Sequence, residues 1–104
     1  MREMESALLE AARSVVPSAT WSVATYPLRI DGYDYWQAHR LRGERDGWPG
    51  PLFVGIDSLE SMWDATAGVD AEARIDLFAG LIRGTVAASN VDPDTGEYTG
   101  AQTT

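Results

Sequence analysis

The chain has 104 residues, 44% of them hydrophobic, with 16 acidic residues, eight arginines, no lysine and a formal net charge of −8. This length and composition predict a single globular domain and exclude a disordered chain. The lack of cysteine excludes disulfides, thiol catalysis and thiolate metal sites.

The charge is unevenly distributed along the chain. Residues 1–50 hold six Arg and seven acidic residues, whereas residues 51–104 hold two Arg and nine acidic residues. A bipolar surface of this kind favours docking, either onto a partner or onto further copies of the same chain.

Residues 3–15 predict an amphipathic helix. Its apolar residues recur at helical spacing: Met4, Leu8, Ala11, Ala12 and Val15. Acidic residues in the first turn suit the helix dipole, and Pro17 ends the helix. The charges inside this segment argue against a signal peptide, and no stretch approaches the ~20 apolar residues of a membrane span. We therefore expect a cytoplasmic protein with no membrane partner.

Residues 20–42 predict a β-hairpin around Asp31-Gly32, a pair typical of a type I′ turn. The turn implies the facing pairs Ile30/Tyr33, Arg29/Asp34, Leu28/Tyr35, Tyr26/Gln37, Ala24/His39 and Trp21/Arg42.

In this register the two faces of the hairpin differ in character. The expected core face holds Ile30, Tyr33, Leu28, Tyr35, Tyr26, Ala24 and Leu41. The other face holds Trp21, Val23, Arg29, Asp34, Trp36, Arg40 and Arg42. Pro27 cannot donate to a ladder, which indicates an edge strand or a bulge. A bulge would exchange the two faces for every residue before it.

The middle of the chain predicts a loop, a strand and a helix. Residues 43–51 form a Gly/Pro-rich loop that carries Trp48, and residues 52–56 read as a short buried strand. Asp57-Ser-Leu-Glu60 resembles a capping box, and it starts a helix that continues to about Ala67.

Asp70 is expected to cap the last helix, at about residues 71–88. Its apolar stripe consists of Ile75, Phe78, Leu81, Ile82 and Thr85. The polar, turn-rich residues 91–104 predict a mobile tail after a globular domain of residues 1–90. The predicted class is α+β: a small single domain in the order α-β-β-β-α-α, with a three-stranded antiparallel meander packed by helices.

Few residues could support catalysis. His39 is the one histidine, no nucleophile motif accompanies it, and a structural role in its strand is favoured. The carboxylates of Asp57, Glu60 and Asp64 share one helix face, which favours a solvated acidic face over a divalent-cation site or a docking surface for a cation-rich partner. Residues 92–97 resemble a calcium loop only superficially, so a turn is favoured. We expect no enzyme, no cofactor and no bound metal.

Two features favour binding. Gly80 and Gly84 stand four apart on the last helix, where they serve either close packing within the chain or self-association. The second hairpin face combines aromatic and basic residues typical of interfaces: Trp21, Arg29, Trp36, Arg40, Arg42 and Trp48. Ordinary packing of these tryptophans beneath the helices is the alternative.

The sequence thus predicts a non-catalytic protein-binding module, a small acidic inhibitor or adaptor of the kind that phages and mobile elements encode against a host protein. One alternative is a structural subunit that assembles into a homo-oligomer, a ring or a filament. An acidic DNA mimic is the other alternative. A sequence pI of about 4.4 and the lack of a basic run argue against nucleic acid as a partner.

Overall fold

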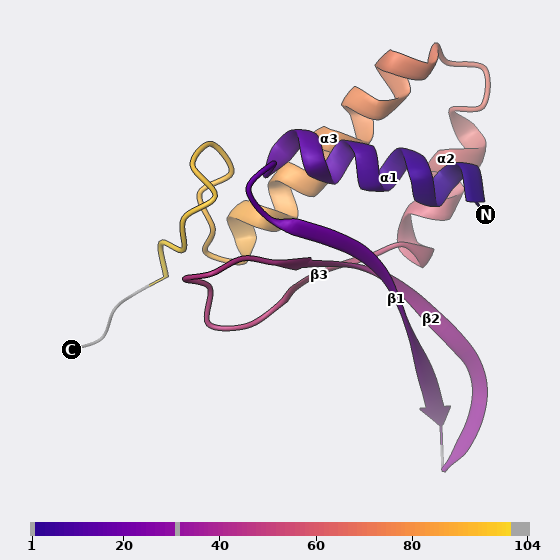
Figure 1. Ribbon diagram of the computed structural model, residues 1–104. Helices are drawn as coiled ribbons and strands as arrows, with labels where there is room; N and C mark the ends of the chain where they lie inside the picture. The colour runs from indigo at the N-terminus through magenta and orange to yellow at the C-terminus, as the bar shows by residue number, and fades with distance from the viewer. Residues whose placement is uncertain (1, 31, 101–104) are drawn as a thin grey trace.

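The computed structural model describes residues 2–30 and 32–100, with the backbone only at residues 2, 26–30 and 33–38. The elements are α1 (Arg2–Val15), β1 (Thr20–Ile30), β2 (Tyr33–Glu44), β3 (Leu52–Gly55), the 3-10 turn η1 (Asp57–Leu59), α2 (Glu60–Ala65) and α3 (Ala71–Ala88). The strands form one antiparallel sheet in the order β1-β2-β3. Helices α1 and α3 lie side by side across one face of this sheet (Figure 1). The predicted α+β class, the element order and the meander are confirmed.

A bulge in β2 sets the register of the first two strands. The pairs Ile30/Tyr33 and Arg29/Asp34 are those expected from the turn, and Gly32 has the positive φ of +83° that such a turn needs. Asp31 lies outside the described residues. The next pair is Leu28/Trp36, which leaves Tyr35 as the extra residue.

Because of the bulge, every earlier residue of β1 faces a β2 residue one position further along than expected. The expected pairs Leu28/Tyr35, Tyr26/Gln37, Ala24/His39 and Trp21/Arg42 are therefore wrong, and Trp21 lies opposite Gly43. The shift by one residue places the β1 side chains at the base of the hairpin on the opposite face of the sheet from the one expected.

Trp21 belongs to the core and not to the arginine-bearing face on which the sequence interpretation placed it. Its side chain is only 4% exposed, and its indole N–H donates to the Val16 carbonyl oxygen at 3.1 Å. Gly43 makes room for the ring, since a Cβ at that position would lie 2.8 Å from the Cζ3 atom of Trp21. Ala24, expected in the core beside Leu41, lies on the opposite face of the sheet.

The core fills the space between the sheet and the two long helices. Its buried side chains come from the sheet's inner face (Trp21, Leu41, Leu52 and Val54), from α1 (Met4, Leu8, Ala11 and Ala12) and from α3 (Phe78, Ile82 and Val86). The spacing of the α3 residues is i, i+4, i+8, one face of a helix. Leu81, expected in this stripe, is instead 39% exposed, because it lies on the far side of the helix.

Asp57 does not form the predicted capping box. A 3-10 turn precedes α2, whose N-cap residue is Leu59 and has no side-chain cap hydrogen bond. The Asp57 carboxylate instead accepts a hydrogen bond from the backbone N–H of His39, at 3.0 Å. α2 ends at Ala65, two residues before the expected end. Asp70 occupies the N-cap position of α3 as predicted, although its side chain makes no cap hydrogen bond.

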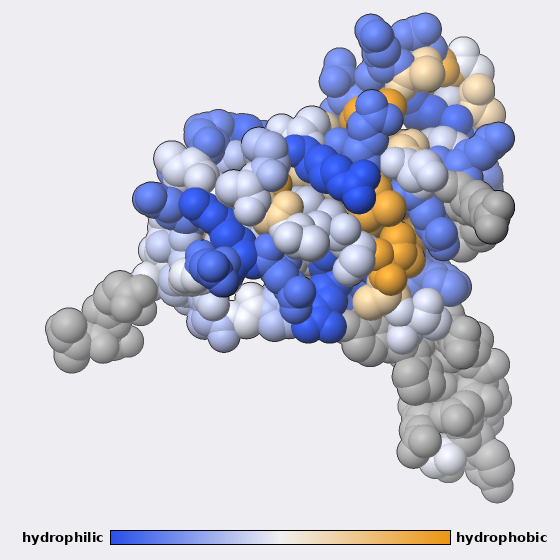
Figure 2. Space-filling model, in the orientation of Figure 1, coloured by the Kyte–Doolittle hydropathy of each residue, from blue (hydrophilic) through white to orange (hydrophobic). Residues whose placement is uncertain are grey.

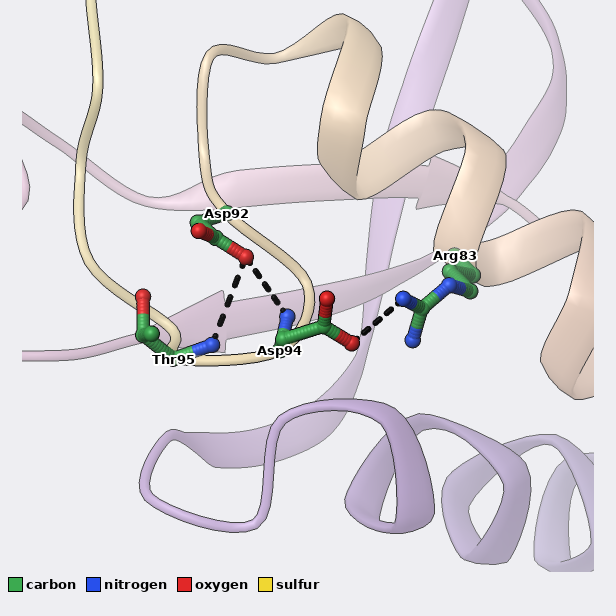
Figure 3. A network of polar contacts seen from close by, with 4 residues as sticks. All are labelled: Arg83, Asp92, Asp94 and Thr95. Atoms are coloured by element: carbon green, nitrogen blue, oxygen red, sulfur yellow. Dashed lines mark hydrogen bonds and ion pairs between the residues drawn. The ribbon is translucent and has the colours of Figure 1, made fainter.

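Residues 91–100 fold back onto the body, in contrast to the predicted mobile tail. Val91 is 4% exposed within the core and forms an isolated β-bridge with Tyr98. The intervening segment makes the predicted turn: the Asp92 carboxylate accepts hydrogen bonds from the backbone N–H groups of Asp94 and Thr95 (Figure 3). An ion pair between Arg83 and Asp94 joins the turn to α3.

The close contact between Gly43 and Trp21 generates a prediction. Gly43→Ala should lower the free energy of unfolding by about 1–3 kcal/mol, because the new methyl group displaces a packed core ring. Urea unfolding followed by tryptophan fluorescence measures the change. Gly50→Ala is the control, since nothing lies within 4 Å of its Cβ position. Equal stability of the two variants would contradict the packing described for Trp21.

Candidate protein-interaction surfaces

The lone histidine is held at the outer end of the three-stranded part of the sheet. The His39 backbone N–H donates to Asp57, and its carbonyl oxygen accepts from the Ile56 N–H at 3.0 Å. Its imidazole Nδ1 lies 3.4 Å from the Thr25 hydroxyl. The residue thus joins β2 to Ile56 and Asp57 through its backbone, and the role of its imidazole stays a prediction.

The predicted acidic face is exposed to solvent. Asp57, Glu60 and Asp64 all lie on the surface of η1 and α2, and Asp57 already accepts the His39 N–H. Among the described residues, no group of three or more His, Cys, Asp or Glu side chains is placed to hold a metal ion.

The outer face of the sheet, defined here by Arg40, Arg42 and Phe53, lies opposite the face that packs against the helices. These residues alternate along β2 and β3 with the buried Leu41 and Val54. The Arg40 guanidinium lies over the Phe53 ring, 5.7 Å from its centroid. Arg42 pairs with Glu44 at 2.6 Å, while its Nε is enclosed and has no hydrogen-bond partner among the described residues. Two of the predicted binding arginines therefore lie together on the outer face of the sheet, where both are partly exposed.

The remaining predicted binding residues do not join this face in the structure. Trp21 is in the core, as described above. Arg29 and Trp36 lie further along the hairpin, opposite Asp34 and Leu28. Their side chains are outside the described part, so their role in binding stays a prediction.

Trp48 anchors the C-terminal segment. Its half-buried indole N–H donates to the Gly96 carbonyl oxygen at 2.7 Å, and the Arg45 guanidinium donates to the Thr95 carbonyl oxygen at 3.2 Å. Both residues line an open pocket of about 320 Å³, together with Asp46, Gly47, Glu97 and Tyr98. Trp48 is thus committed to an intramolecular contact, and the sequence had no signal for it because the partner is a backbone carbonyl 48 residues away.

The first two strands extend well beyond the third. β3 pairs only with Arg40–Gly43, so residues 25–30 and 33–39 form a two-stranded β-ribbon. This ribbon projects away from the helices (Figure 1). Hydrophobic residues gather on the surface between α1 and the root of the ribbon (Figure 2).

The outward side of α3 is also unusual. Gly80 and Gly84 are exposed, and no atom of the described part of the chain lies within 4 Å of a Cβ built at either position. Leu77 and Leu81 on the same side are 48% and 39% exposed. Packing within the chain therefore does not explain the two glycines, each of which costs about 0.5–1 kcal/mol relative to alanine in a helix. Sequence analysis offered the two glycines for close packing or self-association, but it placed Leu81 in the core.

Comparisons with protein-family models, with curated protein sequences and with solved structures gave no match. Among the described residues, no helix has both the length and the apolar character needed to cross a membrane.

The hydrogen bond of Trp48 can be tested with a conservative change. Trp48→Phe keeps an aromatic ring but removes the donor to Gly96. We expect faster amide hydrogen exchange in residues 92–99 and a loss of about 1 kcal/mol of stability. Trp63→Phe is the control, because Trp63 packs against Phe78 on the other side of the core. Similar exchange in both variants would contradict the anchoring role of Trp48.

Proposed function

We propose that this chain is a non-catalytic protein-binding module, an inhibitor or adaptor, whose contact element is the β-ribbon together with the outer face of the sheet. The observation that carries the proposal is the extension of β1 and β2 beyond β3. The small size and acidic, lysine-free composition fit the proteins that phages and mobile elements direct at host proteins in the cytoplasm.

The ribbon's architecture favours a partner. Two-stranded hairpins are marginally stable in water without a third strand or a packed face. At His39 the outer edge of β2 is closed off by Ile56 and Asp57, so pairing with the rest of the sheet stops there. A surface supplied by another molecule would stabilise the part of the hairpin that β3 does not pair with.

The composition of the ribbon supports the same conclusion. Three of the four tyrosines and one of the four tryptophans of the chain lie in it: Tyr26, Tyr33, Tyr35 and Trp36. Aromatic side chains dominate interface energetics because they bury a large area with little loss of conformational freedom.

The outer face of the sheet adds charge to this element. Arg40 directly follows the ribbon in β2, and Arg42 lies on the same face. Arginine forms forked hydrogen bonds with carboxylates and stacks on rings, so the partner surface that fits is one that presents carboxylates. A protein surface that presents carboxylates would complement the arginines at the base of the ribbon and could also pack against its aromatic residues.

A shortened ribbon should separate binding from folding. Replacing residues 26–38 by Asn-Gly closes the hairpin directly after the facing pair Thr25/His39. The change leaves in place the buried side chains of α1, α3 and the three-stranded part of the sheet, so we expect cooperative thermal unfolding within a few degrees of the wild type. Loss of the cooperative transition, measured by circular dichroism, would show that the ribbon is needed for the fold.

Site-specific photo-crosslinking tests the contact itself. A benzoylphenylalanine at Trp36 should give one discrete protein adduct in lysate of the source host, whereas the same group at Glu10, on the exposed side of α1, should not. Excess wild-type protein should compete the adduct away, and the shortened-ribbon variant should not. Identical adducts from both positions, or none from Trp36, would refute the proposal.

A further inference from the structure

We infer that the outward side of α3 is the interface of an antiparallel homodimer. This interface is separate from the ribbon, and the inference does not rest on the proposed function. The outward residues of α3, all exposed, are Ala73, Leu77, Gly80, Leu81, Gly84, Ala87 and Ala88. Helix α3 is therefore apolar on both of its sides, since Phe78, Ile82 and Val86 fill the core.

A helix that is apolar on two opposite sides is normally covered on both of them. The contrast with α1 is informative, because α1 presents Glu3, Glu10 and Arg13 to solvent on its outward side. Both helices cover the same face of the sheet, yet of the two only α3 exposes leucine side chains to solvent on its outward side. A protein surface of complementary shape would remove these apolar residues from water.

The pattern on α3 is complementary to itself. Leu77 and Gly84 lie at equal distances from the midpoint between Gly80 and Leu81. When two copies of α3 pack antiparallel about this midpoint, each leucine faces a glycine of the other copy: Leu77 faces Gly84, and Leu81 faces Gly80. The outermost alanines, Ala73 and Ala88, face one another in the same way. Each leucine thus packs against the exposed backbone of a glycine, which allows the two copies of α3 to approach closely.

The charged residues beside the apolar side of α3 favour a second copy of the chain as its partner, packed antiparallel. Asp76 and Arg83 flank the same edge of the apolar side, seven residues apart and therefore two turns along one face. In the antiparallel pair, Asp76 of each copy lies near Arg83 of the other. In a parallel pair this edge of the two copies would lie on opposite sides of the interface, so Asp76 and Arg83 would not meet. Arg83 is available for this contact because its ion pair with Asp94 is solvent-exposed, with side chains 49% and 72% accessible.

The mass of the full chain in solution is the first test. At ~0.15 M ionic strength, where the repulsion between two chains of net charge −8 is screened, light scattering should give twice the 11.3 kDa chain mass. Gly84→Leu fills the space that receives Leu77 and should raise the dimer dissociation constant roughly tenfold or more. Gly50→Leu adds the same side chain in an open loop and should leave the dimer intact.

Both variants should keep the monomer fold, because a side chain at either glycine meets open space. Leu77→Gln, at a 48% exposed position, provides a second disruption that does not alter helix-backbone freedom. The shortened-ribbon variant should dimerise like the wild type, so failure of the ribbon proposal and failure of this inference give different results. A monomer at all concentrations, or a dimer insensitive to both Gly84→Leu and Leu77→Gln, overturns the inference.

The absence of native cysteine allows a direct test of direction. Ala73→Cys and Ala88→Cys proteins should form a disulfide-linked dimer when mixed and oxidised, whereas neither alone should do so. In the antiparallel pair, Ala73 of one copy faces Ala88 of the other, while the two Ala73 positions are about 22 Å apart. A disulfide needs Cα atoms within ~7 Å. Cross-linking of Ala73→Cys with itself would overturn the antiparallel arrangement.

Discussion

The packing of Trp21 over Gly43 is the contact on which the arrangement of this molecule depends. The ring enters the core only because the facing residue has no side chain, and its indole N–H satisfies the carbonyl oxygen of Val16 at the end of the first helix. The bulge at Tyr35 brings these two residues into the same pair. It therefore decides which side of the sheet receives α1 and α3, and it leaves Arg40 and Arg42 on the opposite side.

The limited length of β3 follows from the next contacts along the chain. After Gly55 the backbone turns. The Ile56 N–H donates to the His39 carbonyl oxygen, and the Asp57 carboxylate accepts the His39 backbone N–H. These hydrogen bonds satisfy the edge of β2 at the point where the third strand stops. The sheet is consequently three strands wide beside the helices and two strands wide beyond them, so the ribbon begins at His39, the residue for which the sequence favoured a structural role.

Sequence reasoning succeeded where the signal was local. Helical spacing, Pro17 and Asp70 predicted the two long helices, and Asp31-Gly32 predicted the hairpin.

Sequence reasoning failed where long-range packing decides the structure. A one-residue bulge leaves no local signature yet reverses every earlier side chain, although the pair of a tryptophan with a strand glycine could have suggested it. The C-terminal segment was missed because one buried valine and hydrogen bonds to Trp48 and Arg45 hold a stretch that is otherwise polar. The candidate surfaces divide similarly: Arg40, Arg42 and the two helix glycines were identified from residue type, whereas the exposure of Leu77 and Leu81 depends on how α3 is rotated.

The two proposed surfaces lie on opposite sides of a two-layer molecule, and their geometry bears on assembly. The bipolar charge of the sequence suggested head-to-tail contacts, which generate rings or filaments. The outward side of α3 is instead self-complementary, and an interface of that type closes after two copies. Because α3 packs against the inner face of the sheet, pairing through its outward side leaves Arg40, Arg42 and the ribbon of both copies uncovered. Such a dimer would present two equivalent ribbons, so a partner with repeated sites would be held by both at once, with an affinity exceeding that of either ribbon alone.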